Sequence, residues 1–402
     1  MPARDRTSDP EPPPEPLVSA CLIVRNEAEM LPACLESLSG LADEVVVVDT
    51  GSTDGTQEIA RGAGATVHSH AWRDDFAAAR NAALDHAHGR WILQIDADER
   101  LAGPGGAPPD RAAIRDGLAS PPAGLAACDA WVLRVRNLGP GTRWSDVGTA
   151  PRLFARRSGL RYRRRIHETL ERSDAAPRCG LLEDLELLHL GYLPEVQTAR
   201  NKADRNRRLS ALALADDPED PELQYYYGLE LARVGRTAEA LVYMRRAWDG
   251  LPAAAVGSAL WHVVVVRTCE VMTRSGCAAE ALARLEPLVA ALPGVAHLHF
   301  LRGEALRKLG RAEEALSCLG AALCLPPAPV AWESSETRCC IWNAIGLIHE
   351  QSGAPAQAVE AYRQSLAFGS TECARTRLAA LEPRLATYTF VVENGQTAAR
   401  RA

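Results

Sequence analysis

Four short apolar runs alternate with three amphipathic segments between residues 17 and 99, and this rhythm constrains the fold more than any other feature of the chain. The runs expected to form strands are 18–24, 44–48, 66–70 and 91–95, and the segments expected to form helices are 30–41, 56–62 and 75–88. Short β-branched strands separated by helices are typical of a parallel sheet that is covered by helices. The sequence therefore predicts an α/β domain with a mostly parallel sheet flanked by helices.

Three of the expected strands end in polar residues. The clusters are Arg25-Asn26-Glu27, Asp49-Thr50-Gly51-Ser52 and Asp96-Ala97-Asp98-Glu99. Because ligands of open α/β sheets lie beyond the carboxyl ends of the strands, we expect the three clusters to meet in one site. Asp96 and Asp98 could together hold Mg²⁺ or Mn²⁺, hard cations that prefer oxygen ligands and bridge diphosphates. Taken alone, the acidic pair suits an ordinary turn, and its place after an apolar strand is what favours a site.

The loop after the second expected strand contains two acidic residues with different expectations. Asp49 is expected to accept hydrogen bonds from a base or a ribose, and Gly51 allows the backbone to turn tightly or to approach a ligand closely. Asp54 stands three residues before Gln57, a spacing typical of a helix-capping box. A cap and a ligand contact are equally compatible with Asp54.

Arg80 lies on the apolar face of its expected helix, four residues from both Phe76 and Leu84. A guanidinium in that position needs an anionic partner, which could be a carboxylate such as Asp49 or a ligand phosphate. The sequence therefore leaves two interpretations open for Arg80, a ligand contact and an internal ion pair.

Two further candidates lie later in the chain. Glu168 could act as a general base that takes the proton of an acceptor. His189 follows an apolar segment and could complete a metal site as a nitrogen ligand. An isolated His or Glu is more often structural, so neither is identified by its own pattern. The basic clusters at 156–157 and 161–165 could offset the charge of a diphosphate or form a solvated face.

The pattern changes near residue 198. Strand-like pieces at 131–135, 152–155 and 185–190 extend the sheet, and only helical patterns follow. Gly228, Gly303 and Gly346 each precede small and large residues at the spacing of a tetratricopeptide repeat, and Cys269 begins a looser copy. Successive members of this set are 41, 34 and 43 residues apart. We predict a disordered tail over 1–16, an α/β domain over 17–197, an all-α repeat solenoid over 198–390 that ends in a capping helix near 371–385, and a tail over 391–402.

Composition narrows the classes of function. The net charge of −6 disfavours a general nucleic-acid-binding protein. No apolar run approaches the ~20 residues of a membrane-spanning helix, and no secretory signal is visible, so we predict a cytoplasmic protein without a transmembrane segment. The eleven cysteines are irregularly spaced and include no C-x-x-C pair, which favours free thiols over a disulfide framework or a zinc site.

Four stretches read together resemble a family 2 glycosyltransferase of the GT-A fold. They are residues 21–27, 48–56, 75–81 and 91–99, within a similarity that extends over about 17–192. With its repeat tail the chain is similar to the sublancin-type peptide S-glycosyltransferases, and its first half is also similar to lipopolysaccharide-core β-glucosyltransferases. The resemblance implies inverting, metal-dependent transfer of a hexose from a nucleoside-diphosphate sugar, most often a UDP-sugar.

The resemblance also implies roles for individual residues. It places Asn26, Glu27, Asp49 and Asp54 in a nucleoside pocket and Asp96 and Asp98 in a metal-binding triplet, and it supports His167, Glu168 and His189 as site residues. We accordingly predict Glu168 and Asp98 as catalytic, Asp96, Asp98 and His189 as metal ligands, and as nucleotide-sugar contacts Arg25, Asn26, Glu27, Asp49, Gly51, Asp54, Arg80 and Asp96.

These expectations define a mechanism and its alternatives. An acceptor nucleophile on a peptide, protein or glycan would attack the anomeric carbon in line and displace the diphosphate, with Glu168 as the base. The repeats would bind the acceptor or a protein partner along their concave face, mediate dimerisation, or only support the enzyme. Two other classes remain: a nucleotidyltransferase, although Arg25-Asn26-Glu27 is not its glycine-rich loop, and a non-catalytic repeat scaffold with a vestigial transferase domain.

Overall fold

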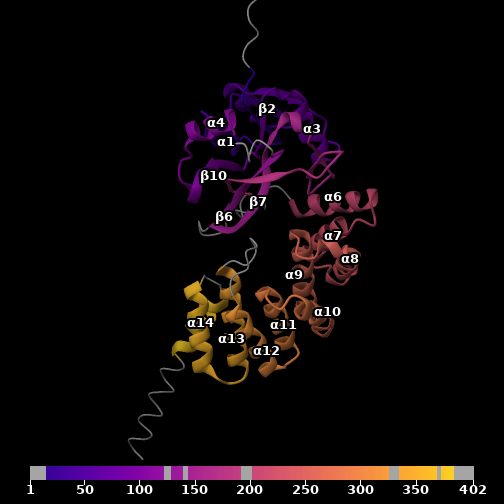
Figure 1. Cartoon of the computed structure of the whole chain (residues 1–402), viewed down its shortest axis with the longest axis vertical. Coiled ribbons are helices and arrows are strands. Elements are labelled where there is room, and N and C mark those ends of the chain that lie inside the picture. Colours follow the sequence, from indigo (N-terminus) through magenta and orange to yellow (C-terminus); the bar gives the residue numbers. More distant parts are fainter. Residues whose placement is uncertain are drawn as a thin grey trace, which may run out of the picture. The chain divides into compact units, whose positions relative to one another are not determined.

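The computed structural model describes residues 15–121, 128–138, 144–191, 202–325, 335–368 and 373–383. These residues belong to two compact units, Met1–Asp217 and Pro218–Ala402, which are coloured from indigo to yellow along the chain in Figure 1. The helix α6 (Lys202–Asp216) clusters with the first unit. Residues 1–14 of the expected N-terminal tail and the whole expected tail 391–402 lie outside the described residues.

The first unit contains an eight-stranded sheet in the order β3-β2-β1-β4-β7-β6-β10-β5. Its strands are β1 (Val18–Val24), β2 (Glu44–Asp49), β3 (Thr66–Ser69), β4 (Trp91–Gln94), β5 (Glu99–Ala102), β6 (Ala130–Leu138), β7 (Trp144–Ala155) and β10 (Cys179–His189). The strands β3, β2, β1 and β4 are parallel, whereas β7 is antiparallel to both β4 and β6. The predicted α/β class is confirmed, with a sheet that becomes mixed beyond β4.

Both faces of β1, β2 and β4 are largely buried, which explains why these strands are mostly apolar, whereas the edge strand β3 is partly exposed. Alternate residues of β1 point to opposite faces. Val18, Ala20, Leu22 and Val24 pack in one cluster, and Cys21 packs in the other. The helices of this unit are α1 (Leu31–Leu38), α2 (Thr56–Gly62), α3 (Phe76–His86) and α4 (Arg111–Ala119).

Helices α1 and α3 cover opposite faces of the sheet. Leu31, Leu35 and Leu38 of α1 belong to the first cluster, and Ala83 and Leu84 of α3 belong to the second. Local residues begin both helices, since α1 carries a proline in its first turn and the Asp75 side chain accepts a hydrogen bond from the backbone of Ala78 at the start of α3. A small antiparallel ribbon, β8 (Arg161–Arg163) with β9 (Thr169–Glu171), packs against α3.

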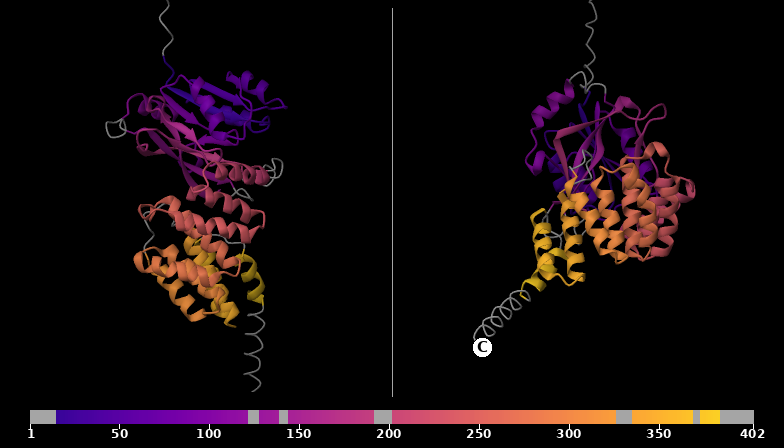
Figure 2. Two further views of the ribbon diagram at one scale, coloured as in Figure 1. Left: turned by 90° about the vertical axis from the view of Figure 1, so that its right-hand side faces the viewer. Right: turned by 60° about the horizontal axis from the view of Figure 1, so that its bottom comes forward.

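The second unit is a stack of antiparallel helix pairs, drawn side by side in Figure 2. The pairs are α7 (Pro221–Arg233) with α8 (Thr237–Gly250), α9 (Ala259–Arg274) with α10 (Ala278–Ala291), α11 (Ala296–Lys308) with α12 (Ala312–Cys324), and α13 (Ser335–Gln351) with α14 (Pro355–Phe368). Residues 373–383 form a further helix, where a capping helix was expected. The all-α repeat solenoid is confirmed.

The predicted glycines stand where paired helices touch. A Cβ on Gly228 would lie 2.6 Å from Cγ of Met244, and a Cβ on Gly346 would lie 2.5 Å from the ring of Tyr362. The Gly303 position is similar, with Leu319 at 2.8 Å. These distances are too short for a side chain, so the repeat pattern reports close helix packing.

All eleven cysteines lie within the described residues and each is free, as the irregular spacing predicted. Within the same described ranges, no helix has the length and apolarity needed to span a bilayer.

Candidate active site

Asp49 is the last residue of β2, and one of its two carboxylate oxygens is hydrogen-bonded within the chain. Its Oδ1 accepts hydrogen bonds from the backbone N–H groups of Gly51 (2.9 Å) and Ser52 (3.0 Å) and from Nε2 of Gln57 (3.1 Å). Burial alone would raise the pKa of Asp49, but these hydrogen bonds together hold it below its usual value. Gly51 adopts a φ of 109°, a backbone conformation that favours glycine, in the turn whose N–H groups contact the carboxylate.

The second oxygen of Asp49 is available to a ligand. Oδ2 is buried and has no hydrogen-bond partner among the described residues. A buried carboxylate oxygen without a donor costs free energy, which a ligand N–H or O–H would recover. The acceptor role of Asp49 stays a prediction, which this unpartnered oxygen motivates.

Asn26 and Asp54 join the loop after β1 to the loop after β2. Asn26 adopts a φ of 55°, its Oδ1 accepts a hydrogen bond from the backbone N–H of Thr53 (2.8 Å), and its own N–H donates to Oγ of Ser52 (2.9 Å). The Asp54 carboxylate accepts from the backbone N–H groups of Ala28 (3.2 Å) and Thr56 (3.0 Å). The two side chains therefore shape the site wall through contacts within the chain.

The capping-box interpretation of Asp54 is wrong. Gly55 is the N-cap of α2, without a side-chain cap bond, and Gln57 bonds to Asp49 instead of reaching back. The N–H of Glu27 donates to Oγ1 of Thr56 (2.8 Å), and Arg25 is exposed at the end of β1. Gln57 thus supports Asp49 in the site, whereas the sequence pattern had placed it in a capping box with Asp54.

Arg80 holds two carboxylates that come from distant parts of the chain. Its Nη1 and Nη2 donate to the two oxygens of Asp96 (3.0 and 3.3 Å), and its Nε donates to Oε1 of Glu168 (2.9 Å). The guanidinium also lies 5.6 Å from the centre of the Tyr162 ring. The anionic partner that the sequence required is therefore a pair of chain carboxylates, and the suggestion that Asp49 fills this place is wrong.

Arg152 and Glu99 complete this network, although neither was predicted as a site residue. Nη2 of Arg152 donates to Oε1 of Glu99 (2.7 Å), Nη1 lies 3.6 Å from Oδ2 of Asp96, and Oε2 of Glu99 accepts from the N–H of Asp96 (2.9 Å). Burial alone would raise the pKa of Asp96, but the charges of Arg80 and Arg152 hold it well below its usual value. Burial raises the pKa of Glu99.

The sequence did contain a sign of this network. Arg152 stands beside the apolar residues Leu153 and Phe154 of β7, where an arginine needs an anionic partner. The antiparallel register of β7 with β4 pairs Leu153 with Leu93, so Arg152 lies near the end of β4, where Asp96 follows.

Asp98 and His189 face each other across a small space. Nε2 of His189 lies 3.7 Å from Oδ1 of Asp98, and its Nδ1 lies 2.8 Å from Oδ1 of Asn137. A Cβ on Gly191 would clash with that Nε2 and would lie 2.6 Å from Oδ2 of Asp98. Burial alone would lower the pKa of His189, but the hydrogen bond and charge of Asp98, with the charges of Glu99 and Asp96, raise it.

The arrangement suits a hard divalent cation in part. A carboxylate and an imidazole facing one another, with a glycine that keeps the space between them open, are a suitable pair of ligands. Asp96 instead contacts Arg80 and Arg152, and in the described part of the chain no three His, Cys, Asp or Glu side chains form a metal-ligand group. The structure thus brings together two of the three predicted ligands, and a cation there would need further ligands from diphosphate and water.

Comparison with known families agrees with this arrangement. Residues 19–103 match the model of glycosyl transferase family 2, and residues 296–329 and 341–368 match the tetratricopeptide repeat. The chain therefore has an N-terminal family 2 glycosyltransferase domain followed by tetratricopeptide repeats. Asp49, Arg80, Asp96 and Asp98 lie inside the range matched to family 2, whereas His189 lies beyond it.

Relatives among curated sequences match between 21% and 62% of the chain. A TPR repeat-containing protein of Synechococcus elongatus is 35% identical over 258 residues, which are 62% of this chain and 61% of that protein. The SPbeta prophage-derived glycosyltransferase SunS of Bacillus subtilis is 25% identical over 234 residues, which are 58% of this chain and 53% of SunS. A glycosyltransferase of Rickettsia bellii is 40% identical over 85 residues, which are 21% of this chain and 29% of that protein. The chain thus spans less than two thirds of the length of each relative.

Solved structures are also similar to part of this chain. MamA 41-end from Desulfovibrio magneticus RS-1 is 20% identical and covers 43% of this chain and 89% of its own, with a TM-score of 0.33. TTC0263, a thermophilic TPR protein of Thermus thermophilus, is 22% identical and covers 46% and 92%, also with a TM-score of 0.33. Similarity at this level supports no argument about function.

Proposed function

We propose that this protein is an inverting glycosyltransferase that moves a hexose from a UDP-sugar to a peptide, protein or glycan acceptor. The observation that carries the proposal is the place of Asp49, Asp96 and Asp98 beyond the carboxyl ends of β2 and β4, the two strands that flank β1, inside the segment that matches family 2. Asp49 and the end of β4 are separated by two strand spacings, about 10 Å, which is the scale of a nucleoside diphosphate.

Asp49 would bind the base of the donor. Its Oδ1 is occupied by Gly51, Ser52 and Gln57, so only the buried Oδ2 is available to a ligand donor. The imide N–H of uracil is a donor of the required kind, which supports a uridine nucleotide.

Asp98 and His189 would hold a divalent cation, Mn²⁺ or Mg²⁺, with Gly191 leaving the space that it needs. When bound, such a cation supplies Lewis-acid neutralisation of the charge on the leaving diphosphate. We propose a ribose contact for Asp96, whose share in the metal would require it to exchange a contact with Arg80 or Arg152.

Glu168 would take the acceptor's proton. The acceptor nucleophile forms a bond to the anomeric carbon from the face opposite the diphosphate, the bond from that carbon to the phosphate oxygen breaks, and the electron pair leaves with the diphosphate. The Glu168 side chain is 13% exposed, and one of its two oxygens bonds to a described residue, Arg80. The other oxygen is thus positioned to accept a proton.

The repeats would bind the polypeptide that carries the acceptor, or join two copies of the chain. Tetratricopeptide matches support a protein-binding role for this unit. A nucleic-acid partner is not part of the proposal, in agreement with the acidic net charge.

The test is turnover by the full chain with a panel of UDP-sugars and Mn²⁺, measured as UDP release with and without candidate acceptors. We expect Asp98→Asn to lower turnover by about two orders of magnitude or more, since it removes a charged ligand next to the diphosphate. The matched control is Asp116→Asn, at an exposed position of α4, which should retain normal turnover.

Three results would overturn the proposal. Normal turnover by Asp98→Asn would remove the role of Asp98. Release of pyrophosphate in place of UDP would identify a nucleotidyltransferase. Failure of the full chain to bind any UDP-sugar in calorimetry would favour the repeat scaffold with a vestigial transferase domain.

A further inference from the structure

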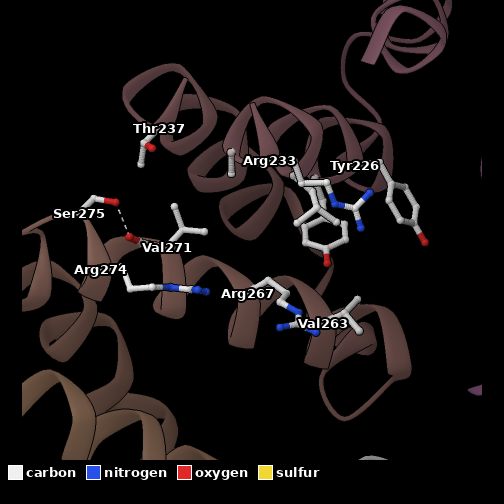
Figure 3. Close-up of a pocket in the computed structure, with 11 residues that line it drawn as sticks. Tyr226, Arg233, Thr237, Val263, Arg267, Val271, Arg274 and Ser275 are labelled. Carbon is white, nitrogen blue, oxygen red and sulfur yellow. Dashed lines mark hydrogen bonds between the residues drawn. The ribbon is translucent and has the colours of Figure 1, made fainter. Parts of the chain in front are cut away.

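Two adjoining hollows lie on the helices of the repeat unit. The larger, of about 820 Å³, lies between α7 and α9, and Figure 3 shows Arg233 extending from one side and Arg267 and Arg274 from the other. The smaller, of about 410 Å³, lies between α9 and α11 and shares Arg267 and Arg274 with the first. Arg267 and Arg274 of α9 line both hollows, and we call the two hollows together the α7–α9–α11 groove.

The groove carries excess positive charge. Of the 11 residues that line the larger hollow, three are arginines and none is acidic. The side chains of Arg233, Arg267 and Arg274 are 53%, 54% and 70% exposed. The smaller hollow adds Arg307 and Lys308 to the two shared arginines, against Glu270 and Glu304. This local excess contrasts with the net charge of −6 for the chain.

The carboxylates beside these arginines leave them accessible to a ligand. One oxygen of Glu270 serves two arginines, Arg267 at 3.0 Å and Arg274 at 3.3 Å. Glu230, a partner of Arg233, is 1% exposed and does not present its charge to the groove surface. Because more than half of each arginine side chain is exposed, an incoming carboxylate can approach the guanidinium groups and form charge-assisted hydrogen bonds with them.

The floor of the groove is apolar. Tyr225 and Tyr226 lie with ring centres 5.1 Å apart, and Leu229, Val263 and Val271 line the same hollow. Val263 is 37% exposed, so part of its side chain is accessible to a ligand in this hollow. An apolar floor beneath arginines suits a ligand that carries apolar side chains between its negative charges.

We propose that the α7–α9–α11 groove binds an acidic stretch of a polypeptide partner in which at least one aliphatic or aromatic side chain lies between the carboxylates. This deepens the proposed function, on which it rests in so far as that polypeptide carries the sugar acceptor. A plain polyanion such as RNA would use the arginines but leave the tyrosine and valine floor unused. If a second copy of this chain were the occupant of the groove instead, it would displace the peptide at high protein concentration.

The experiment uses the full chain and fluorescein-labelled peptides of about twelve residues, followed by fluorescence anisotropy. One peptide alternates Glu and Asp with Leu and Phe, the second replaces every Glu and Asp by Gln and Asn, and the third keeps the carboxylates but replaces Leu and Phe by Ser. We expect the first to bind about tenfold or more tighter than either of the others, and to weaken as salt rises.

Variants then place the binding in the groove. Arg267→Gln with Arg274→Gln should weaken the first peptide about tenfold or more. The matched control is Arg311→Gln with Arg363→Gln, two exposed arginines that line neither hollow and that remove the same charge. The peptide comparison uses the unaltered chain, so it decides the matter even where a variant folds poorly.

Several outcomes would overturn the inference. With the unaltered chain, these are equal affinities for the first and second peptides, equal affinities for the first and third peptides, and RNA binding as tight as that of the first peptide. With the variants, it is an equal loss of affinity in the two double variants. The last is peptide binding that disappears when the chain dimerises. None of these measurements needs a nucleotide sugar. Peptide binding without any sugar transfer would therefore overturn the proposed function alone, and sugar transfer without peptide binding would overturn this inference alone.

Discussion

The carboxylate of Asp96 is held by residues from two directions. Arg80 on α3 contacts both of its oxygens, and Arg152 on β7 approaches one of them. Because Arg80 also bonds to Glu168, the position of the proposed base depends on the same guanidinium. Partly buried charges held in this way keep a defined geometry before any ligand binds, which is the condition for catalysis by positioned groups.

Gly191→Ala tests the space between Asp98 and His189. A Cβ there would clash with Nε2 of His189 and would lie 2.6 Å from Oδ2 of Asp98, so one of the two side chains must move. We expect loss of the Mn²⁺-dependent rise in melting temperature with UDP-sugars, and a fall in turnover of about tenfold or more, as for other displaced ligand groups. Thermal shift and UDP release measure the two effects.

The control is Gly117→Ala on α4, where nothing lies within 4 Å of the new Cβ. An alanine inside a helix should stabilise the protein by about 0.5–1 kcal/mol and leave turnover unchanged. If Gly191→Ala retains the full Mn²⁺ response, Asp98 and His189 do not form the cation site.

At the scale of elements, local pattern predicted β1, β2 and β4 because each is a buried apolar run that ends at a polar residue. It also predicted that their polar ends meet, since parallel strands place those ends at one edge. The strand β5 was not predicted: its four residues follow a turn and exist because they pair with β10 far along the chain. The contact of Arg152 with Asp96 was missed for the same reason, because it depends on the pairing of β7 with β4.

Helix α6 connects two loops near the candidate site. Arg208 donates from Nη1 and Nη2 to the carboxylate of Asp74 (2.5 and 2.6 Å), and Arg165 bonds to Asp216 at the other end of the helix. The N–H of Phe76, the first residue of α3, donates to the carbonyl of Arg165 (2.8 Å). The loop before Glu168 and the start of the helix that carries Arg80 are thus held together, with α6 against both.

A double-mutant cycle with Asp74→Asn and Arg208→Gln tests this connection. Arg208 is 52% exposed, so solvent screens the pair, and we expect a coupling of about 0.5–1 kcal/mol in the free energy of unfolding, measured by urea titration. The matched pair is Asp85 with Arg161, whose side chains are 58% and 44% exposed and which should couple less. Equal coupling in the two cycles would show that the Arg208–Asp74 pair stabilises the loop at Asp74 no more than an ordinary surface ion pair does.

The pH dependence of the same cycle has a defined sign. The hydrogen bond from Arg208 holds the pKa of Asp74 below its ordinary value near 3.8. A carboxyl with a depressed pKa in the folded state stabilises the protein above the unfolded pKa, and this contribution is lost as pH falls through the folded pKa. The coupling should therefore be constant from pH 7 to about pH 5, begin to fall near the ordinary value of 3.8, and be lost once pH falls through the lower pKa of the folded state. A coupling that grows in acid would contradict the assignment.

At the scale of the whole molecule, the two units use glycine in different ways. In the repeat unit, Gly228, Gly303 and Gly346 allow the two helices of a pair to approach each other. In the first unit, Gly51 adopts a positive φ in the turn that contacts Asp49, and Gly191 leaves room beside His189. The spacing of the repeat glycines could be read from the sequence because each repeat is local, whereas the role of Gly191 depends on Asp98, which is distant in the chain.

Gly346→Ala separates the stability of the two units. The new Cβ would lie 2.5 Å from the ring of Tyr362, and overpacking of this kind costs about 1–3 kcal/mol. Since repeats are stabilised by their neighbours, we expect faster hydrogen exchange in α13 and α14, measured by mass spectrometry, with exchange in residues 15–121 unchanged. Gly320→Ala on α12, with open space around the new Cβ, should leave exchange unchanged or slower.

UDP release by Gly346→Ala in the absence of acceptor should match that of the unaltered chain, because Gly346 lies in the second unit and the proposed donor site lies in the first. Faster exchange at β2 or β4 in this variant would contradict the independence of the two units.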